Sequence, residues 1–352
     1  MVNEQFSGNI IILQAFDVGD DINFSKVLNE KMLPVLPSQY SKYFKNYHTP
    51  LTVAPSLLDP KIACSNARLH NFGVLTLRYQ IPFHASFEDL KSEIIALDTQ
   101  YETQSLNDAF FIFNRIKGAV KQPHFFHLRK SYTVVQVNPH TKYEDVVSFK
   151  NTFGNSIAST LRFETETLSE YQKNEILESA FGYYRGDLII VDTEAACVYD
   201  DDYEDVLELF EFANMQQLEL QYFDRVLDTQ LNTVYERQVK APPLMAYLPF
   251  ISVTEGDPMG DLEKLKVDIS VITERLENSI KVAGEAYYSE LYSLLTEKLD
   301  LQNWKESINR KLFIIQDIAA VYQNKIDAVR SDILSVAIII LITLELVILI
   351  IK

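Results

Sequence analysis

Residues 304–351 read WKESINRKLFIIQDIAAVYQNKIDAVRSDILSVAIIILITLELVILII and decide the architecture of the chain. Apolar residues recur along the first part of this stretch at alternating steps of four and three, the heptad pattern of a coiled coil. The positions of this stripe, called the seam below, are Ile308, Leu312, Ile315, Ala319, Tyr322, Ile326, Val329, Ile333 and Val336. Because the seam enters an apolar segment without a break, the sequence predicts one helical rod of ~70 Å, at ~1.5 Å per residue.

The seam can join two helices of one chain or helices of several chains. Residues 261–332 read as a helical hairpin with a connector at Asp300–Asn303, and the seam fits the packing between its two arms. Heptads also associate between chains, and the pattern does not separate the two arrangements, so we expect both, and with them a homo-oligomer. The residues expected at the oligomer and membrane interface are Ile308, Leu312, Ile315, Tyr322, Ile326, Val329 and Glu345.

Residues 333–351 predict a transmembrane helix. A helix of this length measures ~28 Å at ~1.5 Å per residue, against ~30 Å for a hydrocarbon core. Lys325 and Arg330 precede the span, which fits the positive-inside preference if the bulk of the chain is cytoplasmic. We therefore expect a membrane protein with a single-pass C-terminal anchor. The alternative is an apolar helix buried at the centre of a soluble oligomer.

Glu345 interrupts the predicted span. An ionised carboxylate is costly in hydrocarbon, so we expect this side chain to be protonated, paired, or turned towards a neighbouring helix. One interpretation is a polar contact that holds several anchors together in an oligomer. The other is a tolerated acid near the far interface with only local hydrogen bonds. The sequence leaves both open.

The composition limits the classes of function. The chain has 352 residues, enough for two domains, and 32 basic against 49 acidic side chains give a net charge of −17. Direct binding to nucleic acid is not expected, because that affinity rests on neutralising phosphates. The two cysteines, Cys64 and Cys197, are too few for a disulfide framework or a cysteine-based zinc site. No cofactor is expected.

Residues 1–200 predict an α+β domain, because strand-like and helix-like segments alternate along them. The strand at Phe72–Ile81 has apolar residues on one face and polar residues, among them Thr76 and Arg78, on the other. Such one-sided strands predict a sheet with helices on one face, in a ferredoxin-like arrangement.

A connecting helix is expected at residues 201–240, running from about Tyr203 to Gln238. Asp200–Asp202 stand at its start, where carboxylates are favoured by the helix dipole and by free N–H groups. Gln217 and Asp224 interrupt its apolar stripe. Polar groups on such a stripe need partners, so we expect them to fix the register of the helix.

Sequence signatures of common catalytic sites are absent: there is no G-x-x-x-x-G-K-[ST], G-x-G-x-x-G or G-x-S-x-G. His124 and His127 would lie on opposite faces of an extended segment, which is poor geometry for one metal, so packed or exposed imidazoles are expected. Asp187, Asp192 and Glu194 could supply a carboxylate pair for acid–base chemistry, although turn and cap roles are commoner. We expect no catalytic, cofactor-binding or metal-binding residues.

One set of residues in the C-terminal part carries a family resemblance. Its members are Ala213, Gln216, Leu220, Arg310, Lys311, Leu312, Tyr322, Arg330, Leu334, Ile338, Ile339, Leu341, Ile342 and Glu345. With these residues the segment from Ala213 to Ile351 resembles the "required for meiotic nuclear division" family, which has mitochondrial, fungal and bacterial members. The resemblance implies a homo-oligomeric, membrane-anchored protein without known enzymatic activity, and an acidic residue inside the span at Glu345. The mitochondrial member is linked to tethering translation machinery at the inner membrane.

The sequence therefore predicts an N-terminal α+β domain, long coiled-coil helices and a C-terminal transmembrane helix. The function we expect is that of a non-enzymatic, membrane-anchored oligomeric scaffold with a cytoplasmic partner-binding domain. Its expected partners are other copies of itself, the membrane and a further protein of unknown identity. The alternative is a membrane-bound enzyme with an unrecognised carboxylate site, which would require Asp187 and Asp192 to converge in a pocket.

Overall fold

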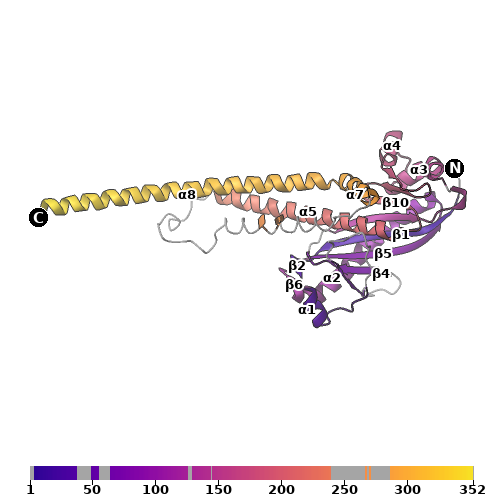
Figure 1. Ribbon diagram of the computed structural model, residues 1–352, viewed down its shortest axis with the longest axis horizontal. Helices are drawn as coiled ribbons and strands as arrows, with labels where there is room; N and C mark the ends of the chain where they lie inside the picture. The colour runs from indigo at the N-terminus through magenta and orange to yellow at the C-terminus, as the bar shows by residue number, and fades with distance from the viewer. Residues whose placement is uncertain are drawn as a thin grey trace. The chain divides into compact units, whose positions relative to one another are not determined.

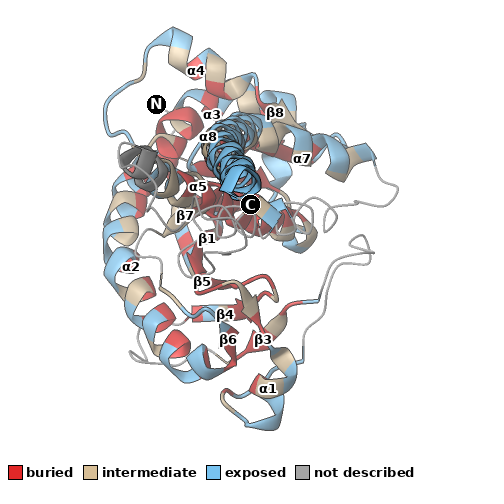
Figure 2. Ribbon diagram, turned by 90° about the vertical axis from the view of Figure 1, so that its left-hand side faces the viewer, coloured by how far each residue is buried: buried red, intermediate tan, exposed pale blue. Residues whose placement is uncertain are grey.

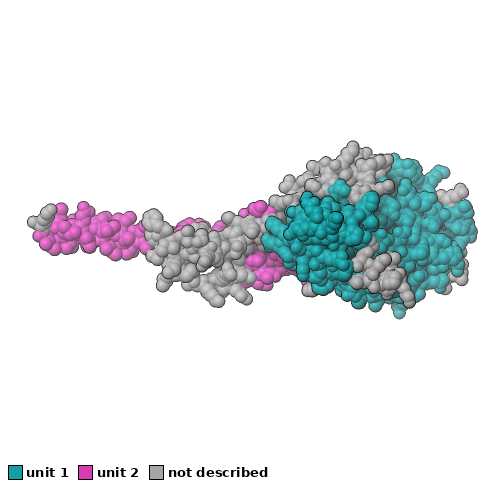
Figure 3. All heavy atoms as spheres, turned by 90° about the horizontal axis from the view of Figure 1, so that it is seen from below, with its two compact units in different colours: residues 1–222, 274–303 teal, residues 223–273, 304–352 magenta. Residues whose placement is uncertain are grey.

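The structure of the chain is a computed structural model. It describes residues 4–37, 49–54, 64–125, 129–143, 145–238, 266–267, 269–270 and 286–351. The chain forms two compact units, each built from two stretches of sequence and coloured separately in Figure 3. Unit 1 comprises Met1–Tyr222 and Glu274–Asn303, and unit 2 comprises Phe223–Thr273 and Trp304–Lys352.

Unit 1 is organised around an eight-stranded sheet with the order β3-β4-β5-β1-β7-β10-β9-β8 (Figure 1). Its strands are β1 (Phe6–Asp17), β3 (Leu51–Val53), β4 (Cys64–Leu69), β5 (Val74–Ala85), β7 (Lys130–Val137), β8 (Ala180–Phe181), β9 (Leu188–Val191) and β10 (Ala195–Tyr199). Neighbouring strands are antiparallel except β10 and β7, which are parallel. A separate two-stranded sheet pairs β2 (Asp21–Ile22) with β6 (Val120–Lys121).

Strand β1 is the centre of the sheet. It pairs with β5 along its whole length, from Phe6 opposite Ala85 to Asp17 opposite Val74, and with β7 on its other edge. The run Ile10–Leu13 is buried on both faces of the strand. A strand covered on both faces has no solvent side, which explains why this stretch reads as continuously apolar rather than alternating.

The described part of the chain contains seven α-helices and two short 3₁₀ turns. They are α1 (Phe24–Asn29), α2 (Phe87–Ile116), α3 (Val146–Leu161), α4 (Glu170–Leu177), α5 (Glu204–Gln238), α7 (Ala286–Lys298) and α8 (Leu301–Ile351), with short 3₁₀ turns at η1 (Lys117–Ala119) and η2 (Thr141–Tyr143). Figure 2 shows the strands largely buried and α2 with a buried stripe beside an exposed one. The long helix predicted from Tyr203 to Gln238 is confirmed to within one residue as α5.

Both faces of the sheet carry helices. On one face the Tyr79 hydroxyl donates to Asp108 of α2, at 2.7 Å. On the other face the Thr76 hydroxyl donates to Glu211 of α5. The prediction that helices cover only one face was therefore wrong. The polar face of β5 resembles a solvent-exposed face in sequence, but Thr76 and Arg78 on this face are buried. Both bond to glutamates of α5.

The predicted class, a mixed α and β unit with a long apolar C-terminal helix, is confirmed. The eight strands of the large sheet exceed the four of a ferredoxin-like fold, so that finer arrangement is not confirmed. Of the hairpin predicted over residues 261–332, most of the first arm lies outside the described residues, and a coiled coil stays a prediction.

Helix α8 runs without interruption through the stretch predicted to form one rod. It begins at Leu301, immediately after Asp300, whose φ of 57° is the left-handed conformation that commonly ends a helix. The predicted connector Asp300–Asn303 is therefore shorter than expected. Within α8, Asn324–Ile351 is long and apolar enough to cross a membrane.

Candidate functional site

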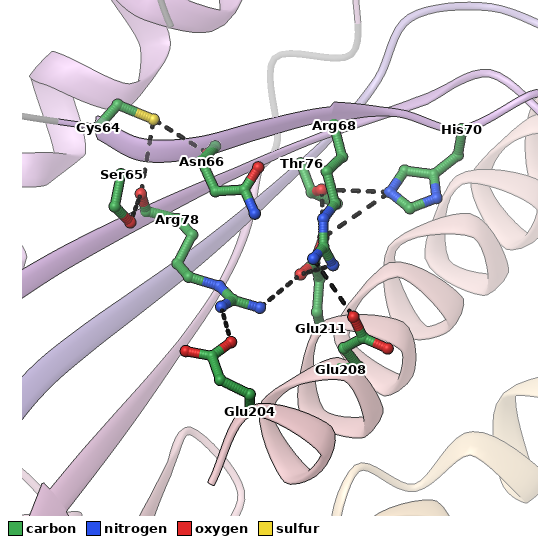
Figure 4. Close-up of polar contacts among 10 residues, drawn as sticks. All are labelled: Cys64, Ser65, Asn66, Arg68, His70, Thr76, Arg78, Glu204, Glu208 and Glu211. Carbon is green, nitrogen blue, oxygen red and sulfur yellow. Dashed lines mark hydrogen bonds and ion pairs between the residues drawn. The ribbon is translucent and has the colours of Figure 1, made fainter. Parts of the chain in front are cut away.

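Helix α5 places a stripe of glutamates on the sheet. Glu204, Glu208 and Glu211 follow one another at steps of four and three, which keeps them on one face of the helix. They meet polar side chains of β4 and β5, where Arg68 lies directly opposite Thr76 in the strand register. Figure 4 shows these side chains converging between the two strands and the helix.

Glu211 is the centre of this group, which we call the Glu211 cluster; it consists of Arg68, His70, Thr76, Arg78, Glu204, Glu208 and Glu211. The Glu211 Oε2 atom lies 3.1 Å from Arg68 Nη1 and 3.4 Å from Arg78 Nη2. Its Oε1 atom accepts the hydrogen bond of the Thr76 hydroxyl. Since that hydroxyl proton points to Glu211, His70 Nε2, at 3.2 Å from Thr76 Oγ1, acts as the donor to Thr76.

The electrostatics of the cluster favour an ionised Glu211 beside a neutral His70. Burial raises the pKa of Glu211, but the charges of Arg68 and Arg78 and the hydrogen bond of His70 outweigh it, so the pKa lies well below the ordinary value of 4.5. Burial lowers the pKa of His70 below 6.5. The contribution of Glu211 to stability is therefore complete above pH 4.5 and is lost as the pH falls through its lowered pKa.

Both guanidinium groups of the cluster pair with carboxylates of the cluster. Arg78 Nη1 lies 2.7 Å from Glu204 Oε2, and Arg68 Nη2 lies 3.3 Å from Glu208 Oε1. Two guanidinium groups thus face three carboxylates. Such a group has no surplus positive charge with which to hold an anionic ligand, and its geometry fits a tie between α5 and the sheet.

A second pair, of a buried Asp17 and a half-buried His124, lies at the end of β1. His124 Nε2 is 2.8 Å from Asp17 Oδ2, and His124 Nδ1 is 3.0 Å from the carbonyl oxygen of Gln122. The Nδ1 atom faces a carbonyl oxygen and therefore carries a proton. The Nε2 atom shares a proton with Asp17, whose own pKa is raised by burial. The imidazole ring stacks on Tyr222 of α5, with ring centroids 5.0 Å apart. His124 is thus a packed imidazole, as expected, and His127 lies outside the described residues.

The pKa values around this pair are shifted. Burial lowers the pKa of His124. The hydrogen bond to Asp17 and the charge of Asp17 raise it by more than burial lowers it, so the pKa lies above 6.5. Burial raises the pKa of Glu219 strongly, and the charges of Asp17 and Asp20 raise it more, which favours the protonated form of Glu219. In the part of the chain that the structure describes, no group of histidine, cysteine and carboxylate side chains is placed to hold a metal ion.

The structure does not bring Asp187 and Asp192 together. They flank opposite ends of β9, ~16 Å apart at ~3.3 Å per strand residue. Asp187 accepts the backbone N–H groups of Tyr183 and Tyr184 and so closes a turn. Asp192 Oδ2 lies 2.6 Å from Arg162 Nε in an ion pair. Asp187 therefore has the turn role expected from the sequence, whereas the ion pair of Asp192 was not expected.

The first part of the seam is buried within the chain. Ile308, Leu312, Ile315 and Ile326 are buried, Val329 is half-buried, and the side chain of Tyr322 lies outside the description. Further along α8, Ile333, Val336 and Glu345 are exposed. The packing role of the early seam positions is therefore intrachain, while their role between chains stays a prediction.

The polar residues on the apolar stripe of α5 bond to the loop between α7 and α8 and to α8 itself. The amide of Gln217 donates to the carbonyl oxygen of Leu299, at 2.9 Å. Within unit 2, Lys311 Nζ of α8 lies 2.7 Å from Asp224 and 2.6 Å from Asp228, both on α5. These contacts agree with the expected use of Gln217 and Asp224 in fixing helix register.

Sequence reasoning missed the Glu211 cluster and the Asp17–His124 pair. A signal for the cluster was available, because Glu204, Glu208 and Glu211 form a charged stripe beside the apolar stripe of the same helix. No comparable signal marks Asp17 and His124, which lie 107 residues apart.

Replacing Glu211 with glutamine should destabilise the protein strongly. Glu211→Gln leaves Arg68 and Arg78 buried with less compensating charge, and we expect the free energy of unfolding to fall by about 3–5 kcal/mol. The matched control is Glu204→Gln, since the Glu204 side chain is 63% exposed against 6% for Glu211. For this control we expect a loss below about 1 kcal/mol. Chemical denaturation of both full-length variants in detergent measures the difference, and equal losses would contradict the assignment.

The Asp17–His124 pair predicts a loss of stability on the alkaline side. Because the pKa of His124 is raised on folding, its contribution is present in full below pH 6.5 and disappears as the pH rises through the raised pKa. The difference in unfolding free energy between the native chain and His124→Gln should therefore shrink as the pH rises above 6.5 and through the raised pKa of His124. Asp17→Asn should show the same trend. A difference that stays constant or grows with pH would overturn the assignment.

Comparisons with known proteins agree with one another. The family model described as "Uncharacterized protein MJ0711, N-terminal domain" matches residues 7–205, from β1 into the first turn of α5. A relative, Uncharacterized protein MJ0711 of Methanocaldococcus jannaschii, is 23% identical over 263 residues, which cover 73% of this chain and 78% of the relative. No solved structure matches the chain. The resemblance to the meiotic nuclear division family stays a prediction. Since the family model spans more than half of the chain, the protein belongs to the MJ0711 N-terminal domain family.

Proposed function

We propose that the chain is a membrane-anchored scaffold: α8 anchors it in a bilayer, and the α/β unit binds a protein partner on the cytoplasmic side. The observation that carries this proposal is the segment Asn324–Ile351, which is long and apolar enough to cross a membrane.

The exposure of this segment supports insertion in a bilayer over burial in a soluble core. Every side chain from Ile333 to Ile351 is exposed, on all sides of the helix. Leaving apolar surface in water costs about 25 cal/mol per Å². A hydrocarbon core covers such a helix on all sides at once. Lys325 and Arg330, just before the span, favour a cytoplasmic location for the preceding residues.

Of the polar residues in the span, Glu345 supports association between anchors. The hydroxyls of Ser335 and Thr343 donate to the backbone carbonyls of Ser331 and Ile339, so both are satisfied within the helix. Glu345 lies ~18 Å along the helix from Ile333 at ~1.5 Å per residue, beyond the midplane of a ~30 Å core. A carboxyl group at that depth is stabilised by a partner on a neighbouring helix, which we propose to be a second copy of α8.

Two buried carboxylates of the α/β unit, Glu211 and Asp192, are engaged in ion pairs, which favours a structural use of these charges over catalysis. Glu211 holds α5 on the sheet, and Asp192 pairs with Arg162. The rival function, a membrane-bound enzyme, would need Asp187 and Asp192 in one pocket. Their separation at opposite ends of β9 favours the scaffold.

Membrane fractionation tests the anchor. The full-length chain should remain in the pellet after alkaline carbonate and be released by detergent. Ile339→Lys combined with Leu346→Lys places two charges in the span, each costing about 2.5–3.5 kcal/mol near the centre of a bilayer, and should release the chain into the carbonate supernatant. The matched control, Ile339→Leu with Leu346→Ile, should behave like the native chain.

A chain ending at Ser331 should be soluble without detergent. If the lysine variant and the chain ending at Ser331 both pellet with the native protein, the apolar segment is not the anchor and the proposal fails.

A further inference from the structure

The turn between β8 and β9 presents two tyrosines outside the clusters described so far. Tyr183 is 64% exposed and Tyr184 is 75% exposed. Both Asp187 carboxylate oxygens accept backbone N–H groups of this turn, from Tyr183 and from Tyr184. Gly182 has room for no side chain, because an added Cβ would lie 2.4 Å from the carbonyl oxygen of Asp187. The turn is therefore held in shape from within while its two tyrosine rings face solvent.

Ring contacts connect this turn to α7, which lies beside the β8 edge of the sheet (Figure 2). Tyr287 stacks on Phe181, with ring centroids 4.9 Å apart, and meets Tyr183 edge-on at 5.5 Å. Tyr183 meets Tyr184 at 4.8 Å. The rings form a continuous aromatic surface, packed on its inner side and open on its outer side.

Acidic groups border this surface. The antiparallel register of β9 and β10 pairs Leu188 with Tyr199, so Asp200 comes next to Asp187 at the base of the turn. Burial, and then the charges of these two carboxylates, raise the pKa of Tyr287. Asp201 and Asp202 follow Asp200 in the exposed loop before α5. The turn itself carries a single cation, Arg185. We name the Tyr–Asp surface by the residues Tyr183, Tyr184, Tyr287, Asp200, Asp201 and Asp202.

Tyrosines and carboxylates side by side suit one kind of ligand group. A guanidinium stacks on an aromatic face and donates paired hydrogen bonds to carboxylates, whereas an ammonium does so less well. Tyrosine loses little conformational entropy on binding and is enriched at the energetic centres of protein interfaces. Anionic lipid headgroups and nucleic acid phosphates would be repelled by the aspartates.

We infer that the Tyr–Asp surface binds an arginine-rich segment of a protein partner. This inference rests on the proposed partner-binding function and adds the chemistry of the partner. Arginine side chains of the segment stack on Tyr183 and Tyr184 while their guanidinium groups reach Asp201 and Asp202. The charge complementarity is local, which distinguishes it from the general attraction of a chain with a net charge of −17.

Binding of a fluorescently labelled peptide of alternating glycine and arginine to the full-length chain in detergent tests the inference. The double variant Tyr183→Ala, Tyr184→Ala keeps the charge and should weaken binding about tenfold. Tyr171→Ala is its matched control, because Tyr171 of α4 is 76% exposed and outside the surface, and it should leave the affinity unchanged. The analogous glycine–lysine peptide should bind more weakly than the arginine peptide.

A second pair of variants separates local from overall charge. Asp201→Asn with Asp202→Asn should weaken binding, whereas Glu164→Gln with Glu166→Gln, an equal change of charge at exposed positions elsewhere in unit 1, should not. Equal effects of the two pairs, or an unchanged affinity in the double tyrosine variant, would overturn the inference. Peptide binding in detergent does not require an inserted anchor, so its failure is distinct from a failure of carbonate resistance.

Discussion

The carboxylate of Glu211 is the constraint on which the arrangement of α5 and the sheet depends. It is buried between two guanidinium groups, and moving such charges out of water is costly unless each finds its partner. The cluster is consequently stable only when β4, β5 and α5 are all in place. Its members then act together, since removing one leaves the others buried and underpaired. A helix without these glutamates could slide along the sheet, whereas α5 is held at one register.

Much of the fold follows from local pattern. The apolar run of β1, the extent of α5 and the continuity of α8 are all visible in the sequence, because burial on one or both faces sets the residue pattern directly. The second helical layer was not predictable in this way. Arg78 reads as a solvent-facing residue, and its buried environment is created by Glu211, whose bond to Thr76 spans 135 residues. Periodicity reports which face is apolar, but it does not report which distant charge will cover the other face.

The heptad seam shows the same limit in α8. Its spacing predicted which residues would be buried, and Ile308, Leu312 and Ile315 are indeed buried. The spacing did not identify which residues cover them. In the structure these positions are buried within the chain itself. We propose that self-association uses the exposed span around Glu345 and that unit 1 contacts a partner separately, through the Tyr–Asp surface. Anchoring and partner binding are thus assigned to different residues and can be tested one at a time.

The most direct test of an inserted span is the reactivity of single cysteines along α8 in sealed vesicles, probed with a membrane-impermeant maleimide. The background is low, because Cys64 and Cys197 are buried and burial raises the pKa of each thiol to about 12. With the vesicles oriented so that unit 1 faces the reagent, Asn324→Cys should be labelled, and Ile339→Cys only after detergent is added. Equal labelling of the two positions in intact vesicles would contradict a membrane-spanning α8.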